Sequence, residues 1–131
     1  MLKRLPFVVL LTLPTTVFAL DEKYQECYDI TVSSAIQSCM NDRYAESMEN
    51  LTAEQEAFIL RAANSVTNPT LFNRKAKEEQ NLWKRYTQSK CQMEASSDAL
   101  RNSYSYWISY YQCLSIKADK KARYYRTYRF D

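Results

Sequence analysis

The chain has 131 residues, with 18 Lys and Arg against 15 Asp and Glu, and it contains neither glycine nor histidine. Without glycine it has no phosphate-cradling loop and no dinucleotide fingerprint, because both need backbone positions that only glycine fills comfortably. Without histidine it has no Ser-His-Asp or Cys-His catalytic group and no histidine metal site. We therefore expect a non-enzymatic protein with no catalytic residues, no cofactor and no metal.

The N-terminal segment has the layout of a secretory signal peptide. Lys3 and Arg4 precede the apolar run LPFVVLLTLP, and small residues follow up to Ala19. We predict a signal peptide at 1–19, cleaved after Ala19, and a single domain at 20–131 that is periplasmic or secreted. A membrane anchor is the alternative, but prolines interrupt a run that would need about 20 apolar residues. We expect no stable membrane span after cleavage.

Charge is divided unevenly along the predicted mature domain. Residues 21–60 hold nine acidic side chains against Lys23 and Arg43, a balance of −7, whereas residues 61–131 are close to +8. The two halves either attract each other as packed antiparallel helices, or the acidic half presents a surface to a cationic partner. We favour the intramolecular explanation, since blocked charge is often only a solvated helix face.

The first predicted helix begins near Val32. The segment before it, 21–30, is acidic and aromatic, and Thr31 offers an N-cap hydroxyl. Thr52 and Gln55 have the spacing of a capping box and predict a second helix from 53 to about 64, with a single bent helix as the alternative. Apolar residues recur every three or four positions along the first helix, at Val32, Ile36, Cys39, Met40, Tyr44, Met48 and Leu51.

Two further helices follow the connector 64–70. Pro69 pushes the chain out of helical geometry, and Thr70 is expected to cap a third helix that ends near Ala95, before a turn at 96–98. The last helix is predicted from about Tyr104 to Tyr128. Its predicted buried face holds Trp107, Tyr111, Leu114, Ala118, Ala122 and Tyr125. The fold class is therefore all-α, a small disulfide-stapled bundle of about four helices.

One stretch, 76–91, is expected to organise the fold. Gln80, Trp83 and Tyr86 fall three residues apart, and Cys91 closes the run. Residues three and four apart share one face of a helix, so we expect a structural seam that packs on the last helix. The two aromatic residues would alternatively line a sugar-binding cleft.

Four cysteines in an exported domain predict two disulfides, with three possible connectivities. Within one continuous helix Cys27 and Cys39 would lie about 18 Å apart, beyond the reach of about 7 Å, so their pairing requires Cys27 to fold back along the first helix. Cys91 and Cys113 bracket the predicted turn before the last helix. We prefer the pairs Cys27–Cys39 and Cys91–Cys113.

These residues resemble the pattern of the LprI-like lysozyme inhibitors, a family of small exported bacterial proteins. The most specific part is glutamine, tryptophan, aromatic and cysteine at Gln80, Trp83, Tyr86 and Cys91. Further matches are Cys27, Thr31, Cys39, Tyr44, Leu51, Cys113 and Arg123. The resemblance implies a four-cysteine helical scaffold and inhibition of a lysozyme-type muramidase.

The expected function is binding of a protein partner, a cationic lysozyme, through an acidic helical surface whose contact residues the sequence does not identify. Such muramidases carry two carboxyl groups in a cleft, which an inhibitor has only to cover. An immunity protein against a toxin delivered to the periplasm is one alternative. Another is an envelope-associated domain that docks through the basic and aromatic segment KADKKARYYRTYRF. We expect no nucleic-acid partner.

Overall fold

The computed structural model describes residues 19–131, and within them it contains four α-helices and no strand. These are α1 (Ala19–Tyr28), α2 (Ser33–Ala63), α3 (Pro69–Asp98) and α4 (Tyr104–Thr127). The all-α prediction is confirmed. The predicted signal peptide lies outside the described residues except for Ala19, which begins α1. Side chains are described from Glu22 onward, Asp98 excepted.

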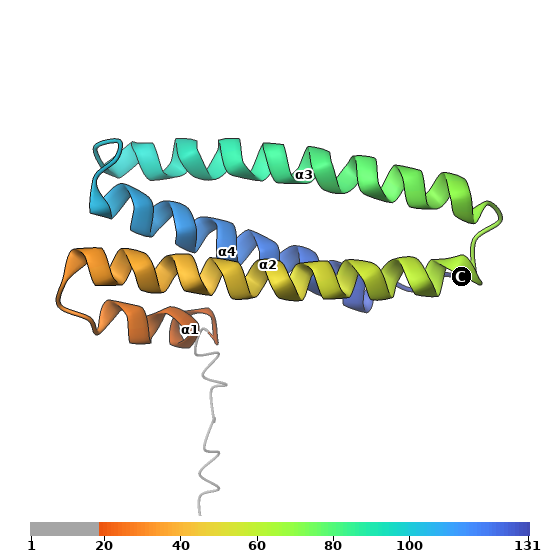
Figure 1. Ribbon diagram of the computed structural model, residues 1–131, viewed down its shortest axis with the longest axis horizontal. Helices are drawn as coiled ribbons and strands as arrows, with labels where there is room; N and C mark the ends of the chain where they lie inside the picture. The colour runs from red at the N-terminus through yellow and green to blue at the C-terminus, as the bar shows by residue number, and fades with distance from the viewer. Residues whose placement is uncertain (1–18) are drawn as a thin grey trace, which may run out of the picture.

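The helix α4 is the centre of the arrangement, because α2 and α3 both pack against it and touch each other only slightly. Consecutive helices run in opposite directions, so α2 and α4 point the same way (Figure 1). The short α1 folds back along the first part of α2. The bundle therefore consists of three long helices with one short helix on its side.

Two of the predicted helices are one continuous helix, α2, so the alternative of a single helix was the right one. The capping-box prediction at Thr52 was wrong, since its hydroxyl donates to the carbonyl of Met48 (2.9 Å) inside the helix. No glycine or proline interrupts this span, and the buried stripe continues through Leu51 to Phe58. Burial of that stripe keeps the helix intact past a local start signal.

Both predicted N-caps were also wrong. The N-cap of α2 is Val32, without a side-chain hydrogen bond, and Thr31 is exposed just before it. The N-cap of α3 is Asn68, whose Oδ1 accepts from the Leu71 N–H (3.0 Å). Pro69 then occupies the first helical position, where a missing N–H costs no hydrogen bond. This displaces the cap by two residues from Thr70.

The turn between α3 and α4 lies a few residues later than predicted. Ser96 and Ser97 donate to carbonyls within α3 (both 2.7 Å), so the helix continues to Asp98. The chain reverses over 99–103, where Asn102 has φ 65°, a left-handed conformation that asparagine tolerates. Ser103 then caps α4 by accepting from the Tyr106 N–H (3.2 Å).

Most of the predicted buried face of α4 is correct. Leu114, Ala118, Ala122 and Tyr125 are buried, whereas Trp107 and Tyr111 are half-buried. The buried positions in the first part of the helix are Tyr106 and Tyr110, because the stripe keeps a spacing of four residues from Tyr106 to Ala122. Along α4 this stripe joins a cluster around Leu51 and Phe58 to a second around Cys91 and Ala95.

Two disulfides staple the bundle. Cys27 pairs with Cys39 (Cα–Cα 5.5 Å) and holds α1 on α2, and Cys91 pairs with Cys113 (Cα–Cα 5.7 Å) and joins α3 to α4. These are the pairs that the sequence favours. By restricting the unfolded chain, each loop of this length contributes about 3 kcal/mol.

Candidate functional site

The predicted seam on α3 is partly confirmed. Cys91 is fully buried, Trp83 is half-buried against the Leu51–Phe58 cluster, and Gln80 accepts a hydrogen bond from the Tyr125 hydroxyl (3.0 Å). These three contacts make the seam structural. The prediction for Tyr86 was wrong, because its side chain is 66% exposed.

The helical spacing to Cys91 explains the error. Tyr86 lies five residues before the cysteine, about 140° away around the helix, whereas Thr87 lies four residues before it, about 40° away. Once the disulfide turns Cys91 inward, Thr87 takes the buried position (4% exposed) and Tyr86 points outward.

Tyr86 lines a groove along the seam between α3 and α4. The middle of the groove has a volume of about 450 Å³. Smaller hollows of about 230 Å³ and 350 Å³ continue it at either end, and they share Glu79, Lys117 and Tyr124 with the middle. The residues lining the middle are Glu79, Trp83, Tyr86, Thr87, Lys90, Lys117, Lys120, Lys121 and Tyr124.

Lysines dominate the charge of this groove. The Lys121 ammonium pairs with the Glu79 carboxylate and lies 5.2 Å from the centres of both the Tyr124 and Tyr125 rings. Burial, together with the nearby Glu79 charge, raises the pKa of Tyr125, whose hydroxyl donates to Glu79 (3.1 Å). Glu79 is the only acidic residue that lines the middle of the groove, which is therefore positively charged, while Glu94 lines the hollow at one end.

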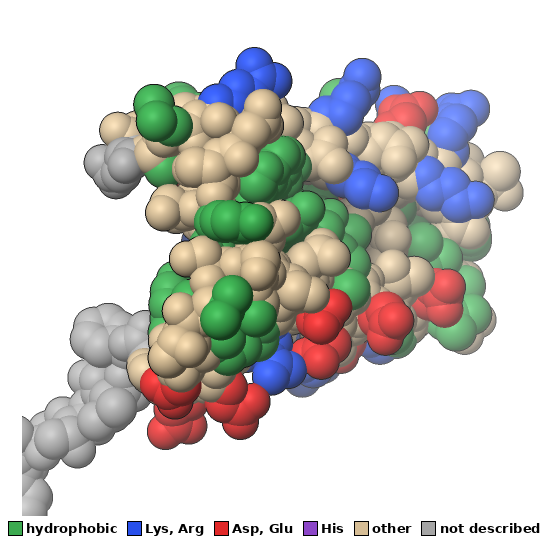
Figure 2. Space-filling view, turned by 60° about the vertical axis from the view of Figure 1, so that its left-hand side comes forward, with side chains coloured by type: hydrophobic (Ala, Val, Ile, Leu, Met, Phe, Trp, Pro, Cys, Tyr) green, Lys and Arg blue, Asp and Glu red, His purple; other side chains and the backbone are tan. Residues whose placement is uncertain are grey.

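The second candidate surface is the acidic face of α1 and α2. We define it by the exposed carboxylates of these helices and of the turn that joins them, Glu22, Glu26, Asp29, Asp42, Glu46, Glu49 and Glu56. Figure 2 shows acidic side chains gathered over the lower part of the molecule, where α1 and α2 lie in Figure 1, and basic ones mostly over the upper part.

Ion pairs decide between the two explanations of the charge asymmetry. Six are present among the described side chains, and only Arg126–Glu54 joins an acid of 21–60 to a base of 61–131. The others lie within one half, or pair Lys23 of the acidic half with Asp119. Helix α2 packs on α4, which carries Lys117, Lys120 and Lys121, yet none of these lysines pairs with an acid of 21–60. The acidic half is therefore displayed to solvent and largely left unneutralised.

Within the acidic face, three carboxylates are aligned on the solvent side of α2. Asp42, Glu49 and Glu56 follow one another at intervals of seven residues, so consecutive ones lie about 10 Å apart along the helix and drift only about 20° per step. The small side chains of Ala45 and Ala53 lie between them and line a shallow, open depression formed entirely by α2. A partner surface can approach closely along this line.

A buried polar network, which the sequence analysis missed, joins α1 to α2 and α4. The Lys23 ammonium donates to the Ser47 hydroxyl (2.6 Å) and to the Asp119 carboxylate (2.7 Å). The Ser115 hydroxyl lies 2.7 Å from that of Ser47 and accepts from the Tyr24 hydroxyl (2.9 Å). The sequence hints at this network only through Ser47 and Ser115, which each occupy a position in an otherwise apolar helical stripe.

This network brings a lysine and two serines together, a combination also used by nucleophilic enzymes. Both serine side chains are closed off from solvent, Ser47 at 1% and Ser115 at 0% exposure. A substrate carbonyl therefore has no access to either hydroxyl in this conformation, and the network serves to hold α1 against the long helices.

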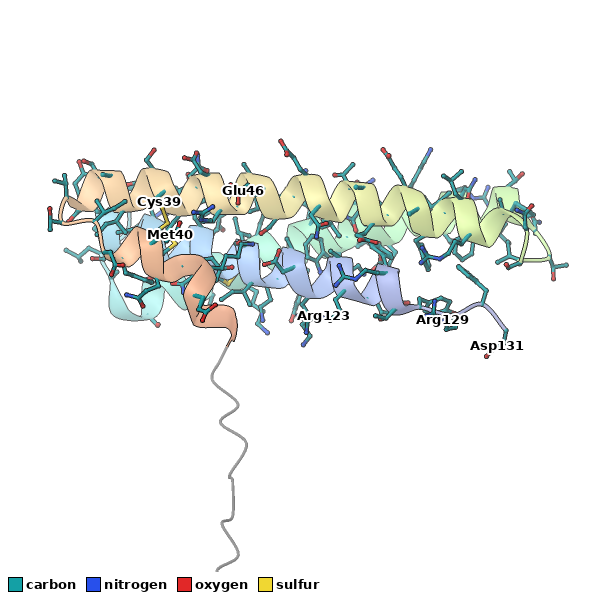
Figure 3. All side chains as sticks on the ribbon, turned by 90° about the horizontal axis from the view of Figure 1, so that it is seen from below. Cys39, Met40, Glu46, Arg123, Arg129 and Asp131 are labelled. Atoms are coloured by element: carbon teal, nitrogen blue, oxygen red, sulfur yellow. A yellow bond between two sulfur atoms is a disulfide. The ribbon has the colours of Figure 1, made fainter. Side chains whose placement is uncertain are left out.

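The remaining residues of the family resemblance are dispersed. Tyr44 stacks on Tyr111 with ring centres 6.2 Å apart, Leu51 is fully buried, and Arg123 is exposed. In Figure 3 Arg123 lies toward the C-terminal end of α4, while the disulfide of Cys39 lies at the other end of the bundle. The resemblance thus describes a scaffold more than a single site.

Among residues 19–131 no helix is long and apolar enough to cross a bilayer. In the same part of the chain no cluster of three or more Cys, Asp or Glu is placed to hold a metal ion. No family model, curated protein or solved structure matches the chain. The likeness to the LprI-like inhibitors therefore rests on its residues alone.

Proposed function

We propose that this chain is an exported, non-enzymatic inhibitor of a cationic lysozyme-type muramidase, and that the acidic face of α1 and α2 is its docking surface. The observation that carries the proposal is that five of the seven carboxylates of this face form no ion pair with a described side chain, namely Glu22, Asp29, Asp42, Glu49 and Glu56. A surface whose charges are unneutralised within the molecule is available to a partner of opposite charge.

Two further features support this proposal. The two disulfides are typical of proteins that work in an oxidising compartment outside the cytoplasm. The residues that resemble the LprI-like inhibitors belong to the scaffold that displays the acidic face. The aligned carboxylates Asp42, Glu49 and Glu56 would accelerate the encounter with a basic enzyme, and the alanines between them would allow close contact beside its cleft.

The test is clearing of cell walls by several classes of lysozyme at increasing amounts of the protein. We expect inhibition at near-equimolar amounts for at least one class. The triple variant Asp42→Asn, Glu49→Gln and Glu56→Gln should raise the inhibition constant by up to about 100-fold, because three exposed charge contacts contribute up to about 1 kcal/mol each. The loss should come mainly from slower association and should shrink as salt is added.

The matched control removes three acids elsewhere, with Glu78→Gln, Glu94→Gln and Asp131→Asn. It changes the net charge equally and leaves the acidic face intact, so it should inhibit as the unchanged protein does. Equal loss in both variants would mean that net charge, and not this face, governs binding. If the unchanged protein leaves every class of lysozyme fully active, the proposed function is wrong.

A further inference from the structure

The α3–α4 groove has no role in the proposed function, and its lining is not that of a buried seam. Apart from Phe58 of α2, every lining residue belongs to α3 or α4. The volume of its middle, about 450 Å³, lies in the range of ligand-binding clefts. The acidic face lies on α1 and α2, so the two surfaces are formed by different helices.

Three lysines give the groove unmatched positive charge. Lys90, Lys117 and Lys120 make no ion pair with any acidic side chain that the structure describes. Lys121 differs, because its side chain is only 13% exposed and is already held by Glu79. The three lysines are thus free to bind an anion, while Lys121 helps to fix the wall of the groove.

Aromatic rings lie beside these lysines. Trp83 is half-buried, whereas Tyr86 and Tyr124 are 66% and 49% exposed. Exposing several aromatic rings in one groove is energetically unfavourable, because their apolar faces remain in contact with water. A flat apolar ligand face, such as the C–H face of a pyranose ring, would cover them.

The length of the groove favours a chain-like ligand. Its linked hollows run from Phe72 to Ala95 on α3, which corresponds to about 35 Å of helix. A single small molecule would fill only part of it. A nucleic acid is less favoured, because no arginine lines the groove and arginine is the side chain of choice for nucleic-acid recognition.

We propose that the α3–α4 groove binds an acidic glycan chain, whose sugar rings lie on Tyr86 and Tyr124 and whose carboxylates or phosphates contact the unpaired lysines. In an exported protein this site would hold the molecule on an anionic wall or surface polymer. It is independent of the acidic face, so the failure of either proposal leaves the other standing.

Binding can be followed by the fluorescence of Trp83 and by calorimetry. The chain has two tryptophans, so Trp107→Phe leaves Trp83 as the only reporter. The probes are a tetrasaccharide that contains N-acetylmuramic acid, a tetrasaccharide phosphorylated at its reducing end, and neutral chitotetraose. We expect at least one acidic probe to bind at least tenfold more tightly than the neutral one, and which acid binds identifies the source of the anion.

Two variants test the assignment to this groove. Lys117→Gln with Lys120→Gln should weaken binding of the acidic probe about tenfold, and Tyr86→Ala should weaken it several-fold. Because these side chains are at least partly exposed and unpaired, thermal unfolding should be almost unchanged. The matched controls are Lys77→Gln with Arg101→Gln, which removes the same charge outside the groove, and Tyr104→Ala, which removes an exposed tyrosine outside it.

Three results would overturn the proposal. The first is chitotetraose binding as tightly as both acidic probes, and the second is the lysine variant binding them as the unchanged protein does. The third is a single-stranded DNA oligonucleotide of equal charge binding more tightly than either glycan, which would identify the groove as a nucleic-acid site.

Discussion

Removing the Ser115 hydroxyl is the most direct test of the buried polar network around Lys23, Tyr24 and Ser47. This hydroxyl accepts from Tyr24 (2.9 Å), lies 2.7 Å from the Ser47 hydroxyl and donates to the Arg43 carbonyl (3.3 Å). Ser115→Ala leaves the Tyr24 hydroxyl without its acceptor, although that side chain is only 1% exposed. A buried polar group without a partner costs about 1–3 kcal/mol, so we expect a loss of about 2 kcal/mol of unfolding free energy.

The partner variant isolates this interaction. Tyr24→Phe removes the hydroxyl together with its need for an acceptor, so alone it should cost about 1 kcal/mol. In the Ser115→Ala background the same change should cost nothing or restore stability, because it removes the orphaned donor. The coupling free energy of the double-mutant cycle should therefore be about 1 kcal/mol or more. Tyr104→Phe, at an exposed hydroxyl, is the control and should change stability by less than about 0.5 kcal/mol.

Urea unfolding with both disulfides intact, followed by circular dichroism, measures all four proteins. A loss of 2 kcal/mol is a substantial part of the 5–15 kcal/mol that holds a domain together. In a domain of this size it should also lower the melting temperature by about 8 °C. If the effects of Tyr24→Phe and Ser115→Ala simply add to within about 0.4 kcal/mol, the two hydroxyls do not depend on each other and the reasoning is refuted.

Two further predictions concern the pH dependence of stability and the disulfide that holds α1. Burial raises the pKa of Tyr24 and Tyr125 above 10, so the unfolded chain loses these protons first, and stability should be complete below pH 10 and fall as the pH rises further. Urea unfolding between pH 9 and 11 should show a shallower fall in Tyr125→Phe, and an unchanged slope would contradict this. Replacing Cys27 and Cys39 by alanine should cost about 3 kcal/mol and open α1, with faster amide exchange in α1 than in α4. Equal exchange in both helices would show that α1 does not depend on the bond.

Predictions of secondary structure, which depend on residues close together in the chain, were correct for the long helices but wrong at several helix ends. Three-and-four spacing of apolar residues identified the three long helices but not the short α1, and Pro69 correctly separated α2 from α3. The cap at Asn68 was missed because asparagine and threonine are both good N-caps, and only the proline that must occupy the first helical turn discriminates between them. The start signal at Thr52 was misleading, because the buried stripe of α2 continues past it.

The candidate surfaces were predictable only in part. The acidic composition of 21–60 was evident from the sequence, but its exposure depends on how α2 is rotated against α4, its main packing partner. Apolar periodicity indicates which side of a helix is buried, but it does not indicate which other helix packs against that side. The lysine and aromatic lining of the groove likewise requires α3 and α4 to be aligned, which places Lys120 of α4 in the same groove as Tyr86 of α3.

The sequence by itself determined that this protein is an all-helical bundle with two favoured cysteine pairs, because helical period, helix breakers and chain reach are properties of near neighbours. Tertiary structure decided the direction of Tyr86, the network around Ser115 and the separation of an acidic face from a basic groove. Each of these depends on the rotation of one helix against another, which the distant contacts and the disulfides set.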